Sequence, residues 1–414
     1  MADVSVLNVR LHGTKIGTIT HIPGDRTFFA FTDEYVADQS RPTLSLSFKD
    51  EHGGLITQWP SKQRRLLPFY SNLLPEGHLR EYLAARAGIH TEREFFLLCA
   101  LGRDLPGALT VDSSEGELWP LEPGEEEGNA PNFKEKALRF SLAGVQLKFS
   151  AVHDDKANKG LTIPAKGVGG SWIVKLPSSR FEGVPENEYA MLTLARSVGI
   201  DVPEIALVDV EDIGDLPEDI GDMRGNAFAI ARFDRTPEGP LHTEDFAQVF
   251  GVYPEEKYGK ASGRNIADVL AVETGEAGIG EFIRRLTFNA LIGNADMHLK
   301  NWSLVYPDRR TPRLSPAYDF VSTIAYIDDD EAALKFVRTR RFDQFSRNEL
   351  SYLAAKARLP EKSVLAVARD TVGRFLDVWE AEKAHLPQDK RVTEKIDAHL
   401  KRLPIVKEWA IRQG

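Results

Sequence analysis

An aspartate and an asparagine in one short motif, followed by a second aspartate, constrain this chain of 414 residues more than any other feature. Asp296 precedes Asn301 by five positions, and Asp319 follows Asn301 by eighteen. In phosphoryl-transfer enzymes, an Asp-x-x-x-x-Asn loop supplies a carboxylate that accepts the acceptor's proton and an amide that holds Mg²⁺. Mg²⁺ takes few hard oxygen ligands from protein, so Asn301 and Asp319 suffice as a predicted metal pair. The alternative is that Asp296 and Asn301 are helix-cap and turn residues.

The residues around this motif predict a helix before it and a hairpin after it. Apolar residues recur at helical spacing from Glu281 to Leu291. Downstream, residues 302–306 and 314–319 are separated by a polar turn that contains proline. The hairpin would bring the asparagine and the second aspartate of the motif together.

Two further residues of the motif are interpreted as functional. Lys300 is predicted to neutralise charge on a transferred phosphoryl group, and His298 to orient the loop through backbone hydrogen bonds. The same spacing occurs in lipid-kinase-like folds, so a lipid or a small molecule remains open as the acceptor.

Upstream, a strand and a helix follow the order expected of a nucleotide-binding sheet. Residues 172–176 form an apolar run that presents Lys175, similar to a strand whose lysine neutralises the α- and β-phosphates of ATP. An amphipathic helix from Glu186 to Ala195 follows, and Glu188 is the predicted partner of the lysine. The alternatives are an ordinary strand-face lysine and a carboxylate that the helix dipole favours in the first turn.

A loop before this strand is the candidate phosphate loop. It offers Gly144, whose lack of a side chain allows backbone amides to approach phosphate oxygens, together with Gln146 and Lys148. Hydroxyls at Ser141 and Ser150 are candidate sites of self-modification beside bound ATP. The alternative is an ordinary turn before a strand.

These segments resemble, in chain order, the HipA family of toxin kinases from bacterial type II toxin–antitoxin modules. The resemblance covers about residues 1 to 325. It is carried by residues 141–148, 173–177, 187–189, 199–203, 231–235, 244–251, 292–301 and 316–319, and in the N-terminal part by residues 70–77 and 101–109. At Leu147, many members carry a polar residue or proline, so the contacts of this loop differ from the family pattern.

The resemblance implies roles for individual positions. Asp296 is the catalytic base, Asn301 and Asp319 are Mg²⁺ ligands, and Lys175 contacts the ATP phosphates. The hinge whose backbone meets adenine would be Ala231, Arg232 and Phe233. Ser141 aligns with the loop serine whose autophosphorylation inactivates such kinases, which agrees with repulsion between a phosphoserine and ATP phosphates.

The resemblance also implies partners. A HipB-type helix-turn-helix antitoxin would bind the chain, and an aminoacyl-tRNA synthetase would be the protein substrate. The formal net charge is −10, with 52 basic against 62 acidic residues, so operator DNA would be contacted mainly through the antitoxin.

The predicted fold class is α+β, a protein-kinase-like two-lobed fold with a small N-terminal antiparallel-sheet domain and a mostly helical C-lobe. The predicted domains are residues 1–122, a HipA-type N-terminal domain; residues 132–235, a region like a kinase N-lobe; and residues 236–414, the helical C-lobe. Strands are expected at 4–11, 27–31 and 43–48, and helices at 79–101, 346–357, 360–383 and 389–402, within a pattern that is helical from Glu331 onward. A charged, turn-rich linker is expected at residues 122–131.

Composition indicates the compartment. Cys99 is the single cysteine and lies in an apolar helical run, so it is expected in the core and cannot form a disulfide within the chain. No apolar run approaches the ~20 residues of a membrane helix, and the N-terminus has no leader pattern. A cytoplasmic protein without membrane contact is expected.

The leading hypothesis is therefore an ATP- and Mg²⁺-dependent serine/threonine protein kinase toxin. The alternatives are a small-molecule or lipid kinase of atypical fold and a catalytically silent co-repressor partner of an antitoxin.

Overall fold

The computed structural model describes residues 5–86, 88–114, 148–154, 159–163, 170–178, 180–216, 223–327 and 331–410. The chain forms two compact units. Unit 1 contains residues 1–176, 208–254 and 305–310, and unit 2 contains residues 177–207, 255–304 and 311–414. The predicted linker at 122–131 lies outside the described residues, and the three predicted domain ranges stay predictions.

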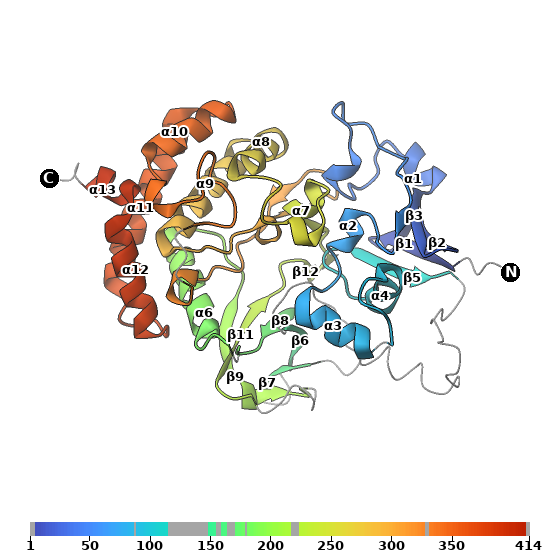
Figure 1. The fold of residues 1–414 in the computed structure, drawn as a ribbon, viewed down its shortest axis with the longest axis horizontal. Helices are drawn as coiled ribbons and strands as arrows, with labels where there is room; N and C mark the ends of the chain where they lie inside the picture. The colour runs from blue at the N-terminus through green and yellow to red at the C-terminus, as the bar shows by residue number, and fades with distance from the viewer. Residues whose placement is uncertain are drawn as a thin grey trace. The chain divides into compact units, whose positions relative to one another are not determined.

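Unit 1 begins with a five-stranded antiparallel sheet, in the order β4-β3-β2-β1-β5 (Figure 1). Its strands are β1 (Ser5–Leu11), β2 (Thr14–Ile22), β3 (Arg26–Phe31), β4 (Lys62–Gln63) and β5 (Leu109–Ser113). A two-residue turn joins β1 to β2, and both of its residues, His12 and Gly13, have positive φ angles of 50° and 79°. Such turns match the twist of the strands they connect, so the turn sets the register of this hairpin.

Helices complete the first part of unit 1. They are α1 (Asp33–Ala37), α2 (Pro68–Ser71), α3 (Gly77–Arg86) and α4 (Glu94–Leu101). The helical region expected from 79 to 101 is therefore two helices, and Cys99 is buried in α4, as predicted.

The strand predicted at residues 43–48 is wrong, because residues 46–48 form a 3-10 turn, η1 (Leu46–Phe48). Ser45 caps this turn by accepting a hydrogen bond from the Ser47 amide at 3.1 Å. The Leu46 amide donates to the buried Glu244 carboxylate at 3.0 Å. Side chains thus satisfy backbone groups that a strand would have paired with a neighbour.

A six-stranded sheet follows, in the order β10-β7-β6-β8-β11-β9, and all its strands except β9 lie wholly in unit 1. Its strands are β6 (Lys148–Asp154), β7 (Lys159–Thr162), β8 (Trp172–Lys175), β9 (Ile205–Asp209), β10 (Ile213–Gly214) and β11 (Asn226–Ala231). The remaining elements of this unit are β12 (Arg235–Thr236), β13 (Gly239–Pro240), β14 (Thr243–Asp245) and α7 (Phe246–Val249). Strand β8 lies in the centre of the sheet, between β6 and β11, as its apolar sequence predicts.

Unit 2 is mostly helical and packs around α9. Its elements are α6 (Val184–Val198), α8 (Gly263–Glu273), α9 (Gly275–Ile292), α10 (Arg347–Lys356), α11 (Glu361–Glu382), α12 (Lys390–Arg402) and α13 (Pro404–Ala410), with short strands β15 (Ser303–Val305) and β16 (Arg313–Leu314). Figure 1 shows α10 to α13 gathered beside α9. His399 of α12 bonds to the Ala290 carbonyl near the end of α9 at 2.8 Å, which fixes the end of this helix.

The C-terminal helices agree with the predicted ranges, but the helical pattern does not extend back to Glu331. Described residues 331–346 contain isolated bridges, turns and one 3-10 turn, η7 (Phe342–Gln344). The Glu349 carboxylate accepts the amides of Val337 and Arg338 at 3.0 and 2.7 Å, which stabilises this irregular backbone. Among the described helices, none combines the length and hydrophobicity that a membrane span requires.

Candidate functional site

The loop that carries Asp296 starts where α9 ends. Gly293 caps this helix with φ 64°, a left-handed conformation that residues other than glycine rarely adopt. A Cβ atom at this position would lie 2.5 Å from Ile324 Cδ1, so both backbone and space require glycine. The chain therefore leaves the buried helix at a fixed point and turns into residues 294–301.

Asn294 connects this loop to the segment that carries Asp319. Its buried side chain donates to Asn289 Oδ1 at 2.8 Å and to the Asp319 carbonyl at 3.4 Å. Its Oδ1 accepts the Asp296 amide at 3.0 Å. One side chain thus contacts the helix end, the candidate base and the candidate metal ligand. We assigned no role to Asn294 from sequence, although a polar residue directly after a capping glycine was the available signal.

The backbone and side chain of Asp296 have different surroundings. Its carbonyl accepts the Asn301 Nδ2 group and the His298 amide, both at 2.8 Å. Its carboxylate is exposed, and Oδ1 accepts the Tyr258 hydroxyl at 3.1 Å. The loop therefore holds the backbone of Asp296 while the carboxylate faces outward, as a group that takes a proton from an external acceptor requires.

The Asn301 side chain is oriented by the same contacts. Because its Nδ2 donates to Asp296, its Oδ1 is left to accept from, or ligate, another group. Asp319 lies in the left-handed region with φ 56°, which Asp tolerates better than most residues and which is common at functional sites. Next to it, the Tyr318 hydroxyl donates to the Lys300 carbonyl at 2.8 Å.

The Asn301 and Asp319 segments are thus linked by hydrogen bonds from Tyr318 and Asn294. One amide oxygen and one carboxylate fit Mg²⁺, a hard cation that keeps several water or phosphate ligands. The described residues hold no cluster of three or more His, Cys, Asp or Glu side chains that suits a metal. The predicted pair, Asn301 and Asp319, is one amide and one carboxylate and is therefore not such a cluster.

Helix α6 is tied to the chain just after Asp319. Asn187 is fully buried, and its side-chain amide bonds both backbone groups of Ser322, donating to the carbonyl at 3.1 Å and accepting from the amide at 3.0 Å. Glu188, the predicted partner of the strand lysine, is the next residue of α6 and is 2% exposed. No local sequence pattern indicates this role of Asn187, because its contact joins residues 135 positions apart.

In unit 1, two lysines face one another across neighbouring strands. Lys148 of β6 lies directly opposite Lys175 of β8, and on the other side Phe228 of β11 lies opposite Lys175. Lys175 is only 7% exposed, and its Nζ is 5.6 Å from the centroid of the Phe228 ring. Directly opposed residues of antiparallel strands project to the same face of a sheet, so the two ammonium groups lie on one face. This face therefore suits an anion such as a phosphate group.

The predicted hinge begins at the last residue of β11, and one of its side chains, Arg232, belongs to a buried ion network. Arg232 donates to Asp104 at 3.0 Å and to both carboxylate oxygens of Asp234, each at 3.0 Å. The Arg232 amide donates to the Ser171 carbonyl at 2.8 Å, and its carbonyl accepts the Arg235 amide at 3.1 Å. The Arg232 side chain therefore stabilises unit 1. Adenine contact by Ala231, Arg232 and Phe233 stays a prediction.

Burial acts against the charge of Asp234, but Arg232 and Arg235 outweigh it and hold the pKa of this carboxyl below its usual range. The Asp234 carboxylate is thus ionised and paired with both arginines. Ser141, Gly144 and Gln146 lie outside the described residues, so nothing is added to their predicted roles. Ser150 is described, and its side chain is fully buried in β6.

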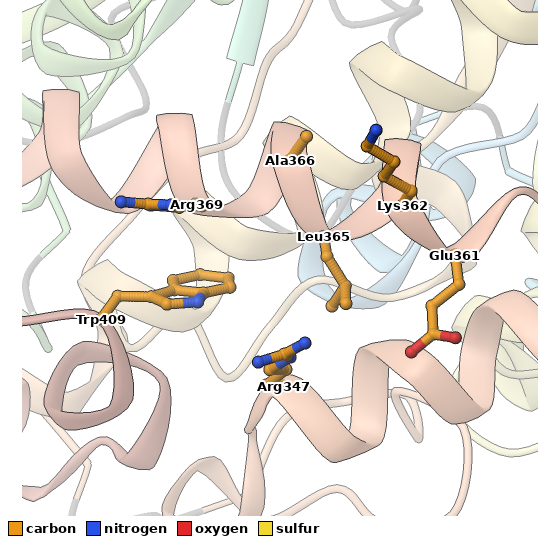
Figure 2. Close-up of a pocket in the computed structure, with 7 residues that line it drawn as sticks. All are labelled: Arg347, Glu361, Lys362, Leu365, Ala366, Arg369 and Trp409. Carbon is orange, nitrogen blue, oxygen red and sulfur yellow. The ribbon is translucent and has the colours of Figure 1, made fainter. Parts of the chain in front are cut away.

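A pocket lies elsewhere in unit 2 and contains none of the predicted site residues. Its lining comes from α10, α11 and α13: Arg347, Glu361, Lys362, Leu365, Ala366, Arg369 and Trp409 (Figure 2). Trp409 and Arg347 lie beside the face of α11 that presents Leu365. This pocket is separate from the Asp296 loop in the chain and shares no residue with it.

A mainly antiparallel sheet that presents a buried lysine and a helical unit that presents an Asp-x-x-x-x-Asn loop define the class of protein-kinase-like α+β folds. Residues 140–379 match the HipA-like C-terminal domain, and residues 7–112 match the HipA N-terminal domain. The chain belongs to the HipA family.

Individual relatives agree with this assignment. The "Putative kinase Y4dM" of Sinorhizobium fredii is 57% identical over 99% of this chain and 100% of the relative. The "Serine/threonine-protein kinase toxin HipA" of Shewanella oneidensis is 26% identical over 83% of this chain and 80% of the relative. Among solved structures, the Shewanella oneidensis HipA, HipB and operator DNA complex contains a chain of the same fold, with a TM-score of 0.70 and 21% identity. The match covers 97% of this chain and 99% of that chain.

Proposed function

We propose that this chain is a serine/threonine protein kinase and the toxin of a bacterial type II toxin–antitoxin module. It transfers the γ-phosphate of ATP to a serine or threonine hydroxyl of a protein, with an aminoacyl-tRNA synthetase as the proposed substrate, and it phosphorylates its own Ser141. The names of its relatives support the kinase and toxin assignments. The likeness to the chain from the Shewanella oneidensis complex supports a HipB-type antitoxin and operator DNA as partners.

One observation carries the proposal. The backbone carbonyl of Asp296 fixes the amide of Asn301, so a single loop presents an outward carboxylate and an amide oxygen side by side. The Asp296 carboxylate is exposed while its backbone makes three hydrogen bonds to residues of the same loop. This arrangement supports a base and a metal ligand held in fixed relation.

The proposed roles follow from these positions. The Asp296 carboxylate takes the proton of the acceptor hydroxyl as its oxygen bonds to the γ-phosphorus. The bond from that phosphorus to the bridging oxygen breaks, and ADP leaves. Asn301 and Asp319 would hold Mg²⁺, which would neutralise phosphate charge. Lys175 and Lys148 bind the phosphates, Glu188 pairs with Lys175, Lys300 stabilises the transferred group, and the His298 amide positions the Asp296 carbonyl.

The test compares the wild-type chain with Asp296→Asn after incubation with Mg·ATP, with phosphosites mapped by mass spectrometry. Replacing the base should slow phosphorylation by about 10²-fold or more, because general base catalysis typically contributes that much. Asp268→Asn is the matched control, since Asp268 is a surface residue of α8 paired with Arg264 at 3.2 Å. It should match the wild type.

The other outcomes discriminate between the alternatives. ATP hydrolysis without any protein phosphorylation would favour the small-molecule or lipid kinase. Absence of ATP binding would favour the catalytically silent co-repressor partner. Equal phosphorylation of wild type and Asp296→Asn would reject the assigned base.

A further inference from the structure

Tyr258 is an exposed aromatic residue that reaches the candidate catalytic base. Its side chain is 42% exposed, yet its hydroxyl donates to Asp296 Oδ1 at 3.1 Å. A general base must lie within about 2.6–3.2 Å of the hydroxyl whose proton it takes. The phenol hydroxyl of Tyr258 therefore stands where an acceptor hydroxyl has to stand.

The ring of Tyr258 is held by contacts that do not involve its hydroxyl. It meets the His298 ring edge to face, with centroids 5.1 Å apart, and the Lys257 Nζ lies 5.3 Å from its centroid. The Tyr258 carbonyl accepts Arg340 Nη2 at 2.9 Å. The preceding carbonyl, of Lys257, accepts the Leu299 amide at 3.3 Å. This segment is thus packed on the loop, and a phenylalanine at 258 would keep the ring in place.

Asp296, in turn, does not depend on Tyr258 for its position. Its amide is bound by Asn294, and its carbonyl by Asn301 and His298. The Tyr258 hydroxyl bonds to the carboxylate, the part of Asp296 that must receive the acceptor. These two facts argue against a supporting role for the phenol and in favour of competition with the acceptor.

We infer that Tyr258 selects the acceptor by occupying its position on Asp296, so that an incoming serine or threonine hydroxyl must displace the phenol. The inference rests on the proposed kinase activity. Because the Tyr258 side chain is 42% exposed, moving its hydroxyl into water uncovers little buried surface and costs mainly the ring contacts with His298 and Lys257. This competition defines the class of acceptor. It is a serine or threonine hydroxyl on a segment whose other contacts with this chain compensate for the lost hydrogen bond between Tyr258 and Asp296.

The test measures the rate at which the chain phosphorylates its own serines and threonines at saturating Mg·ATP, for wild type, Tyr258→Phe and Asp296→Asn. Tyr258→Phe removes one hydrogen bond from the resting state and should accelerate the reaction about two- to tenfold. Tyr352→Phe is the matched control, because it removes the same hydroxyl group at a different place. Tyr352 lies on α10 against Arg338 and Lys356. This substitution should leave the rate unchanged.

Three results would overturn the inference. An unchanged rate in Tyr258→Phe would show that the phenol does not compete. A slower rate would show that it supports the base. Phosphate on Tyr258 itself would make it an acceptor. Failure of the proposed function has a different signature, in which wild type and Asp296→Asn are both unmodified. A circular dichroism melt of Tyr258→Phe equal to that of wild type confirms that the fold is intact.

Discussion

Glu244 shows how a single buried residue can set the pH response of unit 1. Its carboxyl is 1% exposed and accepts hydrogen bonds from Ser45, Tyr306 and the Leu46 amide. Burial raises the pKa of Glu244 to about 7, against the effect of these hydrogen bonds. The folded state therefore holds a proton that the unfolded chain releases above its ordinary pKa.

The sign of the pH dependence follows. Where the folded pKa is raised, the stabilisation is complete below the unfolded pKa and disappears as the pH rises through the folded pKa. Between pH 4.5 and pH 7, Glu244 should lower the free energy of unfolding by about 3 kcal/mol. Glu244→Gln should remove this decline, because an amide does not ionise.

The measurement is urea unfolding of wild type and Glu244→Gln at pH 5, 6, 7 and 8. The unfolding free energy of Glu244→Gln should increase relative to that of the wild type as the pH rises. The exposed Glu238→Gln is the control and should track the wild type at each pH. A difference that is constant across the series would show that Glu244 is already ionised in the folded state at pH 5.

At the scale of elements, the end of α9 decides where Asp296 lies. Gly293→Ala places a methyl group in a left-handed conformation and against Ile324. We expect it to destabilise unit 2 by about 2 kcal/mol or more, because the conformation alone costs about 1–2 kcal/mol. The proposed kinase activity should fall with it, since the loop starts at this residue.

Gly373→Ala is the matched change within α11. No atom lies within 4 Å of the added Cβ, and the backbone is helical, so the variant should be neutral or more stable by up to about 1 kcal/mol. Denaturant unfolding of both variants checks the pair. Equal effects of the two substitutions would mean that Ile324 yields to the methyl group and that the cap is not selective.

Elements also show what sequence reasoning can reach. Local patterns predicted β8, α6, α9 and the long C-terminal helices, because apolar periodicity reflects a buried face directly. The motif that contains Asp296 and Asn301 was also visible, because both residues lie close together in the sequence, in one loop. The contacts of Tyr258 and Asn187 were not visible, because they join segments 38 and 135 positions apart. The strand predicted at 43–48 failed because the distant Glu244 binds the backbone there.

At the scale of the whole molecule, the two matched family segments meet within unit 1 through a buried ion network. Asp104, from the N-terminal segment, accepts Arg232 at 3.0 Å and Arg235 at 2.9 Å. Asp104→Asn should destabilise unit 1 by about 3 kcal/mol, because Arg232 and Arg235 would then share the single carboxylate of Asp234. The N-terminal segment and the six-stranded sheet should then lose stability together.

Thermal unfolding followed by circular dichroism and by hydrogen exchange of β5 and β11 tests this expectation. Asp112→Asn is the control, since its pair with Arg10 is 44% and 38% exposed, respectively, and such pairs contribute at most about 1 kcal/mol. Protection lost in β5 but retained in β11 would show that the network does not couple the two segments.

The course of the chain between the units has a consequence for synthesis. Unit 1 is completed by residues 305–310, and within that segment Tyr306 is fully buried, stacks on His242 and bonds to Glu244. Domains generally fold from the N-terminus while the ribosome is still translating. Here unit 1 cannot complete its packing before Tyr306 is synthesised, and by then the ribosome has already translated the Asp296 loop. A nascent chain that stalls before residue 306 should therefore be a target for chaperones and proteases, and no truncated message would yield a finished unit 1 without the Asp296 loop.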